Sequence, residues 1–150
     1  MSLAERIRTE LGVALKAKNL VTANTLRMLM ASVKNAEIEK HGPLSEEEVL
    51  VQIQKAVRIR REAVEGFTKG GRTEMKEKEE AEIRVLEAYL PAQLTDAELD
   101  SLVGAAIAET GATGPADMGK VMKAAMAKAA GRTEGSKVSE FVRRKLKPAA

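Results

Sequence analysis

Three stretches of this sequence begin with the same signal, a Ser or Thr followed three residues later by Glu. The pairs are Ser2 with Glu5, Ser45 with Glu48, and Thr95 with Glu98. In such a capping box the hydroxyl accepts a hydrogen bond from the backbone N–H of the Glu. The Glu carboxylate accepts one from the backbone N–H of the Ser or Thr, so a helix begins there. After each pair, apolar residues recur at intervals of three and four, the spacing of one face of a helix. The sequence therefore predicts amphipathic helices at all three places.

The composition favours helices over sheets. Hydrophobic residues make up 44% of the chain, enough for a packed core, but aromatic residues make up only 2%. β-Sheets draw heavily on aromatic and β-branched residues. The core must therefore be built mainly from Leu, Val, Ile, Ala and Met, and we predict an all-α protein.

The first part of the chain is expected to hold four helices. They run from Ser2 to about Lys18, from about Thr22 to Lys40, from Ser45 to about Phe67, and from about Thr73 to Leu90. The second helix should end at the segment His41-Gly42-Pro43, because Gly and Pro together stop a helix. A short turn over residues 69–72 should join the last two helices as an antiparallel hairpin.

Three charged residues interrupt the apolar stripes of this hairpin. Arg60 lies three residues after Val57 and four before Val64, and Glu79 and Glu82 occupy stripe positions on the next helix. An unpaired charge in a core is costly, so we predict a partly buried structural ion pair of Arg60 with Glu79 and Glu82. The alternative is that the two Glu residues are catalytic. No His, Cys or Asp lies nearby in the sequence to complete such a site, so we favour the structural interpretation.

A proline divides the chain into two parts. Pro91 breaks the helical pattern within residues 90–94, a segment that is short and not rich in Gly or Ser. We therefore expect an ordered elbow rather than a flexible linker. The predicted domains are residues 1–91, a helical-hairpin domain, and residues 92–150, a small three-helix bundle.

The middle helix of the second domain is predicted over residues 118–129, where apolar residues form a continuous stripe. Its members are Met118, Val121, Met122, Ala125, Met126 and Ala129. Gly131 should end this helix in a left-handed conformation, and Ser136 should cap the last helix. The methionines could line an adaptable groove, but core packing is the favoured interpretation.

Charge is segregated within the second domain. Residues 92–117 hold five acids and no Lys or Arg, whereas residues 118–150 hold nine bases and two acids. The candidate RNA-binding residues are Lys120, Lys123, Lys128, Arg132, Lys137, Arg143 and Arg144. A solvated surface with salt bridges is the alternative. Because no aromatic residues alternate with the bases for base stacking, a nucleic acid would be held mainly through its phosphates.

Several kinds of site are not expected. The chain has no Cys, and its single His excludes a His-rich metal site. No phosphate-binding loop, dinucleotide-binding glycine motif or zinc-protease motif occurs, so we expect no catalytic residue, no metal and no cofactor. No apolar run is long enough to span a membrane, and no signal peptide precedes the first helix. We expect a cytoplasmic protein with no membrane partner.

Several short motifs stand out along the chain. In the first domain they are Leu26-Arg27, Arg60 through Phe67, Gly71-Arg72, Glu79, Glu82 and Ile83, and the elbow Tyr89-Leu90-Pro91-x-Gln93-Leu94. In the second they are Met118-Gly119-Lys120-Val121-Met122 and Gly131-Arg132-x-Glu134-Gly135. Together they resemble the YqeY family, small helical proteins related to the C-terminal tail domain of the B subunit (GatB) of the glutamine-dependent tRNA amidotransferase. The resemblance covers essentially the whole chain and departs from the family pattern at Glu134, where an Asp is expected.

The resemblance implies a two-domain helical fold whose second domain is a three-helix bundle like the amidotransferase tail. In the amidotransferase that tail recognises tRNA, while glutamine hydrolysis and kinase chemistry lie in other domains and subunits. It therefore implies a tRNA-binding accessory protein with no active site of its own. Carbon–nitrogen ligase activity with glutamine as amido-N-donor is implied by association only. The alternative is an adaptor that docks an amidotransferase or an aminoacyl-tRNA synthetase through its long hairpin.

Overall fold

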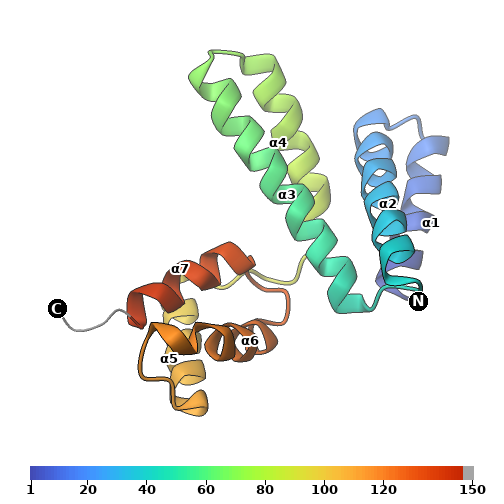
Figure 1. Ribbon diagram of the computed structural model, residues 1–150. Coiled ribbons are helices and arrows are strands. Elements are labelled where there is room, and N and C mark those ends of the chain that lie inside the picture. Colours follow the sequence, from blue (N-terminus) through green and yellow to red (C-terminus); the bar gives the residue numbers. More distant parts are fainter. Residues whose placement is uncertain (147–150) are drawn as a thin grey trace. The chain divides into compact units, whose positions relative to one another are not determined.

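The computed structural model describes residues 1–146, and its secondary structure over that range is helical, with no strand (Figure 1). The elements are α1 (Leu3–Lys16), α2 (Leu20–Lys40), α3 (Glu46–Lys69), α4 (Thr73–Glu87), α5 (Asp96–Thr110), the 3-10 helix η1 (Pro115–Asp117), α6 (Met118–Ala129) and α7 (Gly135–Lys145). The all-α prediction is confirmed. None of the helices in the described part of the chain is long and apolar enough to cross a membrane.

The chain forms two compact units, unit 1 from Met1 to Leu90 and unit 2 from Pro91 onward. Unit 1 is built around a core to which all four of its helices contribute. The residues of this core are Ile7, Leu26, Leu29, Val49, Ile53, Val57, Ile83, Leu86 and Tyr89. Helices α3 and α4 form the expected hairpin, and Gly71 in their turn has a φ of +70°, a conformation that favours glycine.

All three predicted capping boxes are present. The side-chain oxygens of Ser2, Ser45 and Thr95 accept hydrogen bonds at 3.1–3.2 Å from the backbone N–H groups three residues on, and the Glu carboxylates accept the reciprocal bonds at 3.0–3.2 Å. In the second box, a hydrogen bond from Lys40 and those from Ser45 lower the pKa of Glu48 to about 2. These three helices therefore begin where the sequence predicted, because side chains three residues apart form the caps.

Tyr89 ties the end of unit 1 back to its first helix. The Tyr89 hydroxyl donates a hydrogen bond to the Glu10 carboxylate. Arg6 pairs with Glu10 at 3.2 Å, and its guanidinium carbon lies 4.9 Å from the centre of the Tyr89 ring. Burial, reinforced by Glu10, raises the pKa of the Tyr89 hydroxyl.

Unit 2 is a three-helix bundle. Its core residues are Leu99, Val103, Ala106, Val121, Ala125, Val138, Phe141, Val142 and Leu146. Because the three helices are short, each must contribute apolar residues to this single core.

Two predicted helix ends in unit 2 need correction. The left-handed conformation after α6 begins one residue early, at Ala130 (φ +47°), and continues at Gly131 (φ +80°). Ser136 does not cap α7, so that prediction was wrong. The helix begins at Gly135 because the carbonyl of Glu134 already accepts hydrogen bonds at 3.1 Å from the backbone N–H groups of Lys137 and Val138.

Candidate nucleic-acid interface

Helix α6 has a packed side and an exposed side. Val121, Ala125 and Ala129 are fully buried in unit 2. Partly buried against the same core are Met118, Met122 and Met126, so the methionines pack in the bundle. Lys120 and Lys123 are exposed.

Most of the other bases predicted to bind RNA are already engaged by acids. Four bases of unit 2 pair with carboxylates on α5. These pairs are Lys128–Glu109 at 2.7 Å, Lys137–Asp96 at 2.7 Å, Lys145–Asp100 at 3.2 Å and Arg132–Glu98 at 3.5 Å. A further base, Arg144, pairs with Glu140 on its own helix. Acidic and basic blocks that are separate in the sequence therefore pair with each other in the bundle.

Arg132 fastens the elbow to the turn that follows α6. Its Nε donates a hydrogen bond to the Ala92 carbonyl at 2.8 Å, and its own carbonyl accepts one from the Leu94 N–H at 2.8 Å. Its partner Glu98 has a lowered pKa, mainly because Thr95 donates hydrogen bonds to it, with Arg132 contributing less. Arg132 was predicted to bind RNA, and the structure gives it this structural role.

Three of the predicted RNA-binding residues have no ion pair with a carboxylate among residues 1–146, namely Lys120, Lys123 and Arg143. The Nη2 of Arg143 donates a hydrogen bond to Ser139 Oγ at 2.7 Å. The pKa of Asp117 is lowered chiefly by the backbone N–H of Thr113, which donates to it at 3.0 Å, and also by the charge of Lys120. The seven predicted RNA-binding residues thus fall into two groups, those that form an ion pair with a carboxylate and those that do not.

The pairing acids of α5 were not identified from the sequence, although a signal for them was present. The acidic block directly precedes the basic block, and residues 92–150 hold nine bases and seven acids, a net charge of only +2. In a three-helix bundle every helix lies against the other two. Opposite charges on neighbouring helices therefore come within ion-pair distance.

Arg60 forms a buried ion pair with Glu82, as expected, but within residues 1–146 no ion pair joins it to Glu79. Its Nε lies 3.2 Å from Glu82 Oε2, and the two side chains are 9% and 10% exposed. Its Nη1 donates to the Ala56 carbonyl at 3.0 Å, and its Nη2 lies 3.8 Å from the Met28 sulfur. Glu79 is half-buried, and burial, followed by the nearby charge of Glu82, raises its pKa. The cluster joins three helices, which agrees with the structural interpretation.

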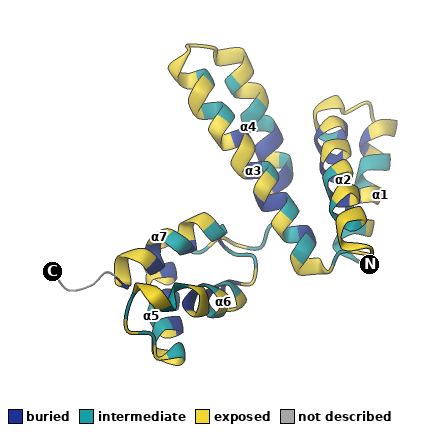
Figure 2. Ribbon diagram, in the orientation of Figure 1, coloured by how far each residue is buried: buried dark blue, intermediate teal, exposed yellow. Residues whose placement is uncertain are grey.

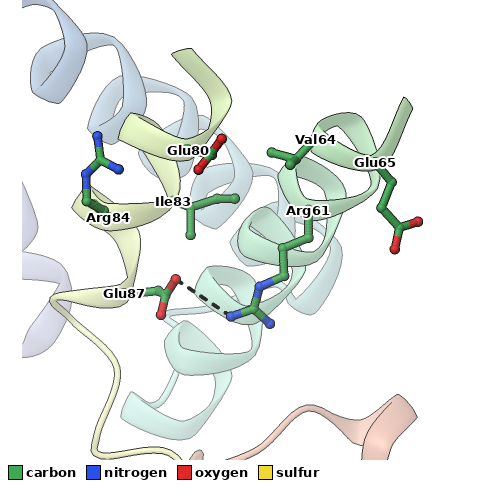
Figure 3. Close-up of a pocket in the computed structure, with 7 residues that line it drawn as sticks. All are labelled: Arg61, Val64, Glu65, Glu80, Ile83, Arg84 and Glu87. Carbon is green, nitrogen blue, oxygen red and sulfur yellow. Dashed lines mark ion pairs between the residues drawn. The ribbon is translucent and has the colours of Figure 1, made fainter. Parts of the chain in front are cut away.

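A shallow groove of about 440 Å³ lies on the α3–α4 hairpin (Figure 3). Its lining combines Val64 and Ile83 with the charged residues Arg61, Glu65, Glu80, Arg84 and Glu87. Arg61 pairs with Glu87 at 3.7 Å. In the part of the chain that the structure describes, no three His, Cys, Asp or Glu residues are grouped in a way that could hold a metal ion.

Residues 4–146 match the family model described as Yqey-like protein. The chain belongs to the YqeY family. The match covers nearly the whole sequence and extends through both units, so the resemblance found in the short motifs is confirmed.

Relatives of this YqeY-family chain include fungal proteins named Altered inheritance of mitochondria protein 41, mitochondrial. The protein of Pyrenophora tritici-repentis is 30% identical over 145 residues, which cover 94% of this chain and 77% of the relative. That of Lachancea thermotolerans is 31% identical over 113 residues (73% and 60%), and that of Eremothecium gossypii 34% identical over 87 residues (57% and 48%). The matched part of this chain thus covers about three fifths of the Lachancea protein and about half of the Eremothecium protein.

The name of these relatives contains the word mitochondrial. The cytoplasmic location expected from the sequence of this YqeY-family chain is therefore not confirmed. Neither the family description nor the relatives' names mention tRNA or an amidotransferase.

Proposed function

We propose that unit 2 binds the phosphate backbone of tRNA and that the chain is a tRNA-binding accessory protein. The observation that carries this proposal is the state of Lys120 and Lys123. Both are exposed on α6, opposite its packed side, and within residues 1–146 neither is joined to a carboxylate. An exposed base that forms no ion pair can contact a phosphate without first breaking one. The choice of tRNA rests on the resemblance to the amidotransferase tail.

The paired bases form a second set of contacts in this proposal. Lys128 and Lys137 are exposed and pair with exposed carboxylates of α5. Exposed pairs of this kind contribute only about 0–1 kcal/mol, so a phosphate can replace the carboxylate at modest cost. Arg143 has no carboxylate partner within residues 1–146 and belongs with the first set.

The test is the salt dependence of tRNA binding by the full chain, measured by fluorescence anisotropy with labelled tRNA. Affinity should fall steeply as salt rises, because bound phosphates release counterions. The double change Lys120→Gln and Lys123→Gln should weaken binding and lower the salt slope by about 2, roughly 1 for each lost phosphate contact.

The matched control is Lys128→Gln with Lys137→Gln, which removes the same charge from paired positions. It should weaken binding less than the first double change. An equal loss in both variants would show that net charge, and not the α6 surface, determines binding. No salt-sensitive binding at micromolar protein would refute the proposal.

A second candidate function is the docking of an amidotransferase or an aminoacyl-tRNA synthetase by unit 1. It is supported by the groove on the α3–α4 hairpin, whose apolar residues Val64 and Ile83 lie among charged side chains (Figure 3). Binding of the purified partner should then survive nuclease treatment. It should be lost when the exposed groove residue Arg84 is changed to Glu.

A further inference from the structure

The end of α1 and the start of α2 expose four aliphatic side chains on either side of the turn that joins them; we call residues 13–21 the α1–α2 turn. Val13 is 61% exposed, Leu15 46%, Leu20 67% and Val21 43%. Every residue from 15 to 21 is exposed (Figure 2). Exposed apolar residues that gather into a patch mark interaction sites, whereas singly scattered ones are ordinary; here four fall within nine residues.

Positive charge accompanies these side chains. Residues 11–36 contain four bases and no acid. The bases are Lys16, Lys18, Arg27 and Lys34, all exposed. Among residues 1–146 none of the four has an ion pair with a carboxylate. The acid just before this stretch, Glu10, is engaged by Arg6 and Tyr89.

Several backbone N–H groups of the turn are hydrogen-bonded within the chain. These bonds run from Ala17 N–H to the Val13 carbonyl at 3.0 Å, from Lys18 N–H to the Leu15 carbonyl at 3.2 Å, and from Asn19 N–H to the Ala14 carbonyl at 2.9 Å. The side chain of Asn19 accepts a further bond from the Thr22 N–H at 3.3 Å. These N–H groups therefore do not need water as a hydrogen-bond partner.

We propose that the α1–α2 turn is a peripheral docking site for the surface of an anionic lipid bilayer. Its aliphatic side chains enter the boundary between headgroups and acyl chains, and Lys16 and Lys18 contact the anionic headgroups. An RNA would use the lysines but would gain nothing from the aliphatic side chains. The expectation of no membrane partner followed from the lack of a spanning segment, and a surface contact requires none.

The test is co-sedimentation of the full chain with vesicles of phosphatidylcholine, with or without about one third phosphatidylserine, at low and high salt. Binding should need the anionic lipid and weaken as salt rises. Leu20→Ser should lower the affinity at least about tenfold, and so should Lys16→Gln with Lys18→Gln. The matched control is Ile59→Ser on α3, which removes an aliphatic side chain of similar exposure (59% against 67% for Leu20) and should leave binding unchanged.

Thermal unfolding of each variant checks that the fold is intact, as expected for changes at exposed positions. The proposal is overturned if the chain does not bind anionic vesicles, or if Ile59→Ser weakens binding as much as Leu20→Ser. It is also overturned if only Lys120→Gln and Lys123→Gln abolish binding, which would place the contact on unit 2. RNA binding that depends on Lys16 but not on Leu20, or self-association abolished by Leu20→Ser, would assign the turn to a different partner.

Discussion

Unit 1 buries one of its ion pairs between α3 and α4, whereas the four ion pairs that α5 forms in unit 2 all lie on the surface. The Arg60–Glu82 pair is about nine-tenths buried, while the pairs of α5 with α6 and α7 involve side chains that are a third to three quarters exposed. Exposed large hydrophobic residues are instead a feature of unit 1. Every such residue in the described part of the chain lies in that unit. The buried pair should therefore matter mainly for the stability of unit 1, whereas the exposed pairs should matter mainly for the surface charge of unit 2.

The largest effect is expected from Glu82→Leu, which leaves the Arg60 guanidinium buried without its partner. Breaking a buried pair in this way costs about 3–5 kcal/mol, so the free energy of unfolding in urea should fall by that amount. The control is Arg60→Met combined with Glu82→Leu, which removes both charges and should cost less. A loss below about 1 kcal/mol in the single variant would remove the contrast between the two units.

A smaller loss is expected from Tyr89→Phe, which removes the hydrogen bond to Glu10. The free energy of unfolding should fall by about 1–2 kcal/mol, because the Glu10 carboxylate loses a partially buried donor. The pKa of Tyr89 is raised in the folded chain, so its contribution is complete below about pH 10, the unfolded pKa, and is lost as pH rises through the folded value. Because the chain has one Tyr and no Trp, ultraviolet titration reports this group alone. A tyrosine that titrates near pH 10 would contradict the assignment.

Glu79→Gln tests the second carboxyl group beside the buried pair. The folded pKa of Glu79 is raised, so the folded chain binds more protons than the unfolded chain above about pH 4.5. Stability from this group is therefore present at acidic pH and is lost as pH rises through the folded pKa. Glu79→Gln should flatten that decline above about pH 4.5, as measured by urea unfolding at each pH. An unchanged pH profile would contradict a raised pKa of Glu79 in the folded chain.

The smallest effect on stability is expected from Asp100→Asn with Glu109→Gln in unit 2. Each change removes one exposed ion pair and should cost less than about 1 kcal/mol. Both leave the capping box of α5 intact and make unit 2 more positive by two charges, so tRNA affinity at low salt should rise. A large loss of stability with no gain in affinity would show that these pairs support the bundle instead of masking its charge.

The fold could be predicted from the sequence because its signals are local. Capping boxes depend on residues three apart, and the apolar stripes depend on residues three and four apart, so neither requires knowledge of tertiary contacts. The buried Arg60 was also detectable, because a charge on an apolar stripe demands a partner. The start of α7 was misplaced because Ser136 suggests a cap, whereas the backbone of Glu134 begins the helix without any side-chain cap.

The candidate site was less predictable because ion pairing depends on which helices become neighbours. Arg132 illustrates the limit. Its position in a basic segment indicated a phosphate contact, but its side chain donates a hydrogen bond to the Ala92 carbonyl, 40 residues away in the sequence. Lys120 and Lys123 could be assigned to the exposed side of α6 from periodicity alone, whereas the finding that neither forms an ion pair within residues 1–146 required the structure.

The hydrogen bond between Tyr89 and Glu10 joins residues 79 positions apart, and this fixes an order of events during synthesis. The core of unit 1 contains residues from Ile7 to Tyr89 and none after Leu90. A nascent chain therefore cannot complete this core until Tyr89 has left the ribosome exit tunnel. Once it has, unit 1 has every residue of its core, so it can finish folding while most of unit 2 is still inside the ribosome or not yet translated.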